Sequence, residues 1–141
     1  MNFFLHLIAT LLIFLTLDVV WLKVIIGDMV DWPWVVRYGY PVNWAWAELY
    51  YLAMAVRLTF GSAYKSMVMN DAAPAFSEGA SMGFWFSMLY ALVNTALFHP
   101  WPIELIVLDV AWNTFAWAAT AVAGYAVGNW LTGNNSQVRR T

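Results

Sequence analysis

The chain has 141 residues, of which 63% are hydrophobic and only 10% charged, with a formal net charge of −2. A soluble domain carries about 25% charged residues, so this composition and a mean hydropathy of +0.65 indicate an integral membrane protein. The small net charge and the lack of a basic stripe exclude a nucleic-acid partner. The absence of cysteine excludes disulfides and thiolate chemistry.

Long apolar runs predict an all-α fold, an integral membrane four-helix bundle in residues 1–131 with a polar C-terminal tail at 132–141. A transmembrane helix needs about 20 predominantly apolar residues. The predicted spans are 3–26, 44–60, 79–98 and 103–131, with a polar loop over 61–77. The first run lacks a preceding Lys or Arg and a following small-residue cleavage site, so we interpret it as a span and not as a signal peptide.

The connector between the first two spans is polar at its start and rich in tryptophan and tyrosine further on. Asp31 followed by Trp32 and Pro33 is typical of a helix start, with Asp as N-cap and Pro in the first turn. Aromatic rings favour the depth of the lipid headgroups. We therefore expect a short interfacial helix between spans 1 and 2.

Small residues recur every fourth position in the last two spans. This spacing places them on one helix face, which lets another helix approach closely within a membrane. The predicted helix-packing residues are Gly79, Gly83, Ser87, Ala116, Thr120 and Gly124.

Acidic residues lie inside the predicted spans, and the first and last spans share the pattern Leu-Asp-Val-x-Trp. Ionisable groups in a span are costly and rare, so each is a candidate functional residue. With a rise of ~1.5 Å per residue, the polar groups of the four spans fall in the outer third of the bilayer, within one or two turns of each other. The predicted intramembrane polar cluster comprises Asp18, Glu48, Asn94, Asp109, Trp21 and Trp112.

Two interpretations of this cluster stay open. One is a site for a proton, a cation or a polar ligand head, in which at least one of two neighbouring carboxylates is protonated. The other is a hydrogen-bonded knot that joins the spans, since polar side chains do bond across membrane helices.

The two histidines, His6 and His99, lie at span ends on opposite sides of the predicted membrane. They cannot share a metal ion, so no metal site is predicted. Each is a candidate ligand for the magnesium of a (bacterio)chlorophyll, although a histidine near the interface is most often simply solvated.

Basic residues give a weak orientation signal. Arg57, Lys65, Arg139 and Arg140 fall on the side of the termini, whereas Lys23 and Arg37 fall on the other side. The positive-inside rule then predicts a multi-pass protein of a bacterial inner membrane with cytoplasmic termini.

A resemblance to a known family extends over most of residues 5 to 128. The segments that carry it are Leu17-Asp18-Val19-Val20-Trp21, Tyr50-Tyr51-Leu52, Tyr90 with Asn94, Trp101-Pro102 and Leu108-Asp109-Val110-Ala111-Trp112. In this order they are similar to the small bacterial inner-membrane proteins of domain of unknown function 2177. The resemblance implies four helices and a membrane location, and no activity. It also implies an acid directly after the tyrosine of the third span, where this chain has Ala91.

Three classes of function were weighed against these residues. No nucleophile–base pair or phosphate-binding loop is present, so the chain is not predicted to be an enzyme. A small accessory or structural subunit that packs against a larger respiratory or photosynthetic membrane complex, or a homo-oligomer, fits the small-residue stripes and the outward aromatics. No cofactor is required, although a pigment or a lipid is a candidate ligand. The alternative is a proton- or cation-coupled small-molecule carrier that uses the Asp/Glu/Asn cluster.

Overall fold

The computed structural model describes residues 3–25, 44–97 and 102–133, and this part of the chain is helical, without a strand. Its elements are α1 (Phe3–Val20), the π-helical turn η1 (Trp21–Ile25), α3 (Trp44–Arg57), the π-helical segment η2 (Leu58–Ala63), α4 (Tyr64–Met69), α5 (Ala73–Leu97) and α6 (Ile103–Thr132). Because η1 continues α1, and α3, η2 and α4 follow one another without a break, these elements form four long helical segments. The all-α prediction is confirmed. The predicted interfacial helix and the tail beyond Gly133 lie outside the described residues.

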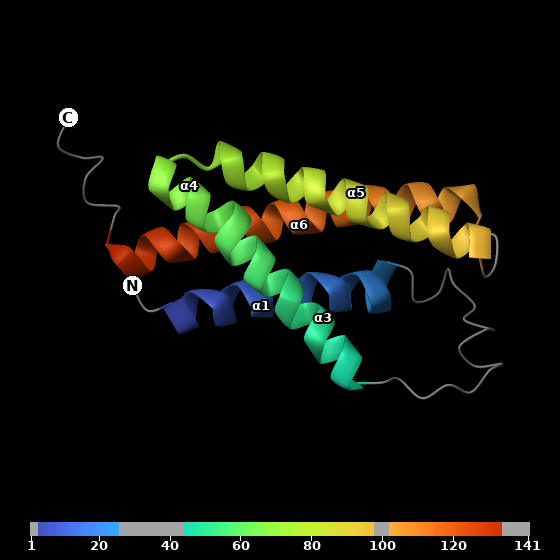
Figure 1. Cartoon of the computed structure of the whole chain (residues 1–141), viewed down its shortest axis with the longest axis horizontal. Helices are drawn as coiled ribbons and strands as arrows, with labels where there is room; N and C mark the ends of the chain where they lie inside the picture. Colours follow the sequence, from blue (N-terminus) through green and yellow to red (C-terminus); the bar gives the residue numbers. More distant parts are fainter. Residues whose placement is uncertain (1–2, 26–43, 98–101, 134–141) are drawn as a thin grey trace.

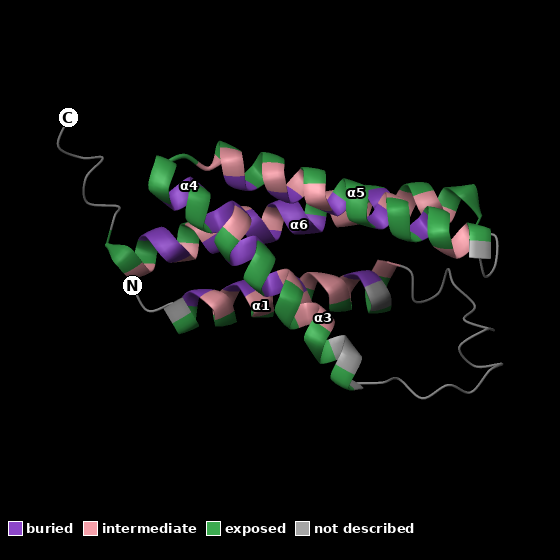
Figure 2. Ribbon diagram, viewed as in Figure 1, coloured by how far each residue is buried: buried purple, intermediate pink, exposed green. Residues whose placement is uncertain are grey.

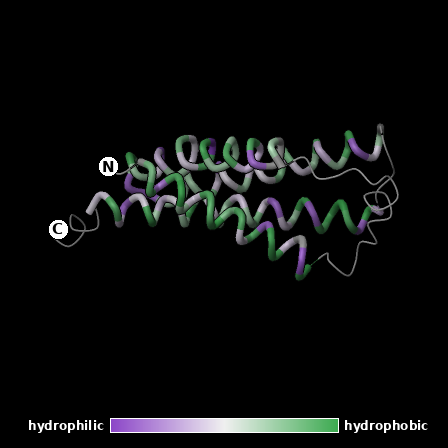
Figure 3. The backbone as a smooth tube through the Cα atoms, turned by 90° about the horizontal axis from the view of Figure 1, so that it is seen from below, coloured by the Kyte–Doolittle hydropathy of each residue, from purple (hydrophilic) through white to green (hydrophobic). Residues whose placement is uncertain are grey.

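Helix α6 lies at the centre of the arrangement and contacts α1, η2, α4 and α5. Helices α1, α5 and α6 follow the long axis, while α3, η2 and α4 cross them obliquely (Figure 1). The start of α1, the turn between α4 and α5, and the end of α6 lie at one end, which we call the terminal end; the opposite end is the distal end. α6 therefore runs antiparallel to both α1 and α5. In two perpendicular views the first turns of α3 diverge from α5 and α6 toward the distal end (Figures 1 and 3).

Two helices are long and apolar enough to cross a membrane, Phe4–Ile25 with a mean hydropathy of 2.2 and Ile103–Thr132 with 1.5. Exposed residues lie on the outward faces of the helices (Figure 2), and many of their side chains are large and hydrophobic. The 30 residues of α6 extend over ~45 Å at the usual helical rise, longer than a hydrocarbon core of ~30 Å. These two helices are candidate spans, and membrane crossing by the other two segments stays a prediction.

The polar loop predicted over 61–77 is wrong. The chain stays helical to Met69 and turns within three residues, where Asn70 adopts a left-handed backbone with φ 52°. The Asp71 carboxylate then accepts a hydrogen bond from the Ala73 backbone N–H at 3.0 Å, and α5 begins at Ala73, six residues before the predicted start of the third span at 79.

The helix continues past Arg57 because its small polar residues are buried and not solvated. Ser62, Ala63 and Ser66 are each 0% exposed. The Ser66 hydroxyl accepts a hydrogen bond from the Ala75 backbone N–H at 2.6 Å, which ties the end of this helix to the start of α5. A hydroxyl that is satisfied within the protein can be buried at little cost.

The small-residue stripe of α5 packs on the backbone of α6. A Cβ built on Gly83 would lie 2.3 Å from the carbonyl oxygen of Asn113, and one on Gly79 would lie 2.8 Å from that of Trp117. Ser87 is buried one turn later and donates to the Gly83 carbonyl at 2.7 Å. The two backbones therefore touch, which only glycine permits at these positions.

The second small-residue stripe covers another face of α6. Ala116 and Thr120 are buried, and a Cβ on Gly124 would meet the Thr10 hydroxyl at 3.0 Å and the Ala63 Cβ at 3.3 Å. This face of α6 thus receives both α1 and η2. One helix serves two interfaces, which explains why it lies at the centre.

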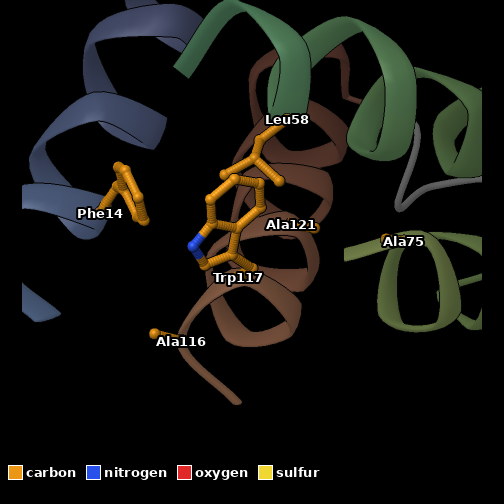
Figure 4. Close-up of a cluster of buried hydrophobic side chains, with 6 residues drawn as sticks. All are labelled: Phe14, Leu58, Ala75, Ala116, Trp117 and Ala121. Carbon is orange, nitrogen blue, oxygen red and sulfur yellow. The ribbon is translucent and has the colours of Figure 1, made fainter. Parts of the chain in front are cut away.

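The hydrophobic core forms where α1, η2, α5 and α6 meet (Figure 4). Trp117 of α6 is 1% exposed and Leu58 of η2 is fully buried against it. Phe14 of α1 meets the Trp117 ring edge-on, with ring centroids 5.7 Å apart and an interplanar angle of 86°. These three large side chains fill the middle of the molecule between its two ends.

Candidate functional site

Asp18 is held by a residue that the sequence did not single out as its partner. The Tyr51 hydroxyl, on α3, donates a hydrogen bond to the Asp18 carboxylate on α1. Both side chains are partly buried. A polar bond of this kind joins two helices inside a membrane, where each unpaired polar group would be costly.

Asp109 supplies the second acid from α6. It is 9% exposed, and its backbone carbonyl accepts a hydrogen bond from the Asn113 side-chain amide at 2.9 Å. Its charge interacts with that of Asp18. Tyr50 packs edge-on against Tyr51, the partner of Asp18, with ring centroids 5.2 Å apart. The structure therefore brings Asp18, Asp109, Tyr50 and Tyr51 into one neighbourhood from three helical segments, and we call these four residues the acid–tyrosine cluster.

The two Leu-Asp-Val-x-Trp motifs meet through their tryptophans. The Trp21 and Trp112 rings are stacked, with centroids 5.6 Å apart and an interplanar angle of 12°. Because α1 and α6 are antiparallel, Asp18 lies about one turn to one side of this stack and Asp109 about one turn to the other. At the usual helical rise the two acids are then offset along the helix axes by ~9 Å, which is less than two turns.

The other two residues of the predicted cluster face elsewhere. Glu48 is exposed on α3. Asn94 donates to the Tyr90 carbonyl of its own helix at 2.8 Å. Of the predicted cluster, Asp18 bonds across helices, to Tyr51, whereas the hydrogen bond of Asn94 stays within α5.

His6 is fully buried at the terminal end, among α1, α4 and α6. A Cβ on Gly128 would lie 3.0 Å from its Cε1 atom and 2.3 Å from the Met67 sulfur, so both side chains close over this glycine. The imidazole is thus enclosed by α4 and α6, and its candidacy as a pigment ligand stays a prediction. His99 lies outside the described residues.

Several hydroxyl groups that the sequence did not single out are buried. Thr59 and Ser62 of η2 are 1% and 0% exposed. A π-helical segment inside a longer helix is rare and frequently marks a functional site. Its signal in the sequence was faint, since small polar residues near a glycine are also typical of a loop.

Among the described residues, no three His, Cys, Asp or Glu side chains gather in a way that could hold a metal ion.

These features define a small helical membrane protein in which two helices each place an acid beside a stacked pair of tryptophans. A family model described as "Predicted membrane protein (DUF2177)" matches residues 3–126, and the chain belongs to this family. The position where the resemblance implies a further acid, Ala91, is fully buried on α5. Comparisons with curated proteins and with solved structures gave no match.

Proposed function

We propose that the chain is a small accessory subunit that packs against a larger membrane assembly, respiratory or photosynthetic, or against further copies of itself. Trp85 is the observation that carries this proposal. It lies at the centre of α5, twelve residues from either end, and is 59% exposed. Tryptophan favours the membrane interface, and in the hydrocarbon region its N–H would lack a partner at a cost of several kcal/mol. A protein surface that covers Trp85 would remove this cost.

The surroundings of Trp85 support a docking surface. Phe84 packs edge-on against it, with ring centroids 5.3 Å apart. Large aromatic side chains dominate the energetics of protein interfaces.

Replacing Trp85 by leucine is expected to release the partner while the chain itself stays folded, because the side chain makes little contact with the rest of the chain. Association is measured by co-purification of the tagged protein from native membranes in mild detergent, together with the absorption spectrum of the complex. Trp130→Leu is the matched control, since Trp130 is 72% exposed in the last turn of α6, where an interfacial anchor is expected. Equal association of both variants with the partner would contradict the proposal.

The same proposal includes the cellular location. Lys65 lies on α4 at the terminal end and Lys23 lies in η1 toward the distal end, whereas Arg57 directly precedes the core residue Leu58. Cytoplasmic termini in a bacterial inner membrane are consistent with the positive-inside rule.

The acid–tyrosine cluster favours a second candidate function, a proton- or cation-coupled carrier. Intramembrane acids that face the protein interior commonly mark ion or proton sites. Asp109→Asn keeps the shape of the side chain, so this variant is expected to fold normally and to lose flux of protons, Na⁺ or K⁺ in proteoliposomes. Wild-type protein without flux of any of these cations would exclude the carrier function and leave the accessory function standing.

A further inference from the structure

One face of α1 is buried along its whole length and changes character from end to end. His6 and Thr10 are 0% exposed, Phe14 is 3% exposed and Trp21 is 5% exposed. The terminal end of this face is therefore polar, its middle is aromatic, and Asp18 follows at the distal end. His6 and Asp18 are about 18 Å apart along the helix.

At the terminal end the Thr10 hydroxyl donates to the His6 backbone carbonyl at 3.0 Å, but the other buried polar side chains there lack partners. Neither ring nitrogen of His6 makes a hydrogen bond of good geometry to the described residues, although the Gly124 backbone lies beside the ring. The π-helical segment η2 brings the hydroxyl groups of Thr59 and Ser62 into the interior, and these also have no hydrogen-bond partner among the described residues. Buried polar atoms without partners are uncommon in proteins and require an explanation such as bound water or a functional role.

A dry layer separates these groups from the acids. It consists of Phe14, Leu58 and Trp117 (Figure 4). The Phe14 ring lies edge-on to that of Tyr51, the partner of Asp18, with centroids 6.0 Å apart. Phe14 thus touches the acid–tyrosine cluster on its distal side.

The dry layer itself contains an unpaired donor. The indole nitrogen of Trp117 is buried and has no hydrogen-bond partner among the described residues. It lies on the side of the ring that faces α1 (Figure 4). If the Phe14 ring moved away and water entered, the Trp117 N–H could donate a hydrogen bond to that water.

We infer that these layers form a proton path along α1, with His6 as the proton-binding residue at the terminal end and Asp18 at the distal end, closed by Phe14. A proton taken up on a free ring nitrogen of His6 passes through water held by the Trp117 N–H to the Asp18 carboxylate, and His6 returns to its neutral form. Chains of aspartate and histidine inside membranes serve as proton relays. The role of Asp18 at the distal end of the path depends on the second candidate function, the proton- or cation-coupled carrier.

The test uses the full chain in liposomes loaded with a pH-sensitive dye, with proton influx driven by a potassium diffusion potential. Phe14→Ala is expected to raise proton influx severalfold over wild type, because it removes the ring that closes the dry layer. Adding His6→Leu to Phe14→Ala is expected to return influx to the wild-type level. If Phe14→Ala does not fold, Phe14→Val with and without His6→Leu replaces it, with a smaller increase expected.

Phe86→Ala is the matched control. Phe86 also contacts Trp117, with centroids 5.3 Å apart, but it is 39% exposed and lies on α5, away from the α1 face. Influx through Phe14→Ala no greater than through Phe86→Ala would overturn the inference, as would a double variant as conductive as Phe14→Ala alone. The flux of the wild-type protein tests the carrier function. The proton path is tested separately, by comparing Phe14→Ala with Phe86→Ala and with the double variant, so failure of the carrier function can be distinguished from failure of the path.

Discussion

Leucine at position 83 is expected to separate α5 from α6 and to lower the free energy of unfolding by about 3 kcal/mol or more, the upper end of overpacking costs. The Cβ atom alone would lie 2.3 Å from the Asn113 carbonyl oxygen and 2.8 Å from its carbonyl carbon. Because these are backbone atoms of a helix, no side-chain rotation can relieve the contact. The measurement is an unfolding titration of the purified protein in mixed detergent micelles.

Gly61→Ala is the control for this prediction. A Cβ there would meet only the end of the Arg57 side chain, which is exposed and free to move. Alanine also favours a helix over glycine by about 1 kcal/mol, so this variant should be as stable as wild type or more so. A Gly83→Leu protein that unfolds like Gly61→Ala would show that α5 and α6 are not in backbone contact.

Replacing Asp18 by leucine is expected to cost about 1–3 kcal/mol of unfolding free energy, because it leaves the Tyr51 hydroxyl without its acceptor. Asp18→Asn keeps an acceptor oxygen in the same place and removes a buried charge, so its stability should equal or exceed that of wild type. The same micellar titration measures both variants. Equal destabilisation by leucine and asparagine would mean that the contact with Tyr51 does not stabilise the fold.

Hydropathy and spacing were sufficient to predict the two strongest spans. The predicted 103–131 agrees closely with α6 (Ile103–Thr132), since a long apolar run ended by Pro102 and Gly133 has few alternatives. The helix from Tyr64 to Met69 was missed. Its serine, Ser66, resembles a loop residue until one knows that it is buried and accepts a hydrogen bond from the first turn of α5, and that is tertiary information.

The candidate site was predicted in part. The repeated motif singled out Asp18 and Asp109, and their tryptophans do meet. The offset between the acids could not be predicted, because helix rise gives depth within one helix and not the register between two. Tyr51 was missed as a partner for a similar reason: the oblique crossing of α3 over α1 decides which of two adjacent tyrosines reaches Asp18.

The most direct test of the accessory function is site-specific photocrosslinking in native membranes, with a benzophenone amino acid in place of Trp85. A protein that covers the centre of α5 should give a discrete adduct of defined mass, which excess unlabelled wild-type chain should compete away. Labelling of lipid alone at this position would show that Trp85 faces the bilayer and would contradict the proposed function.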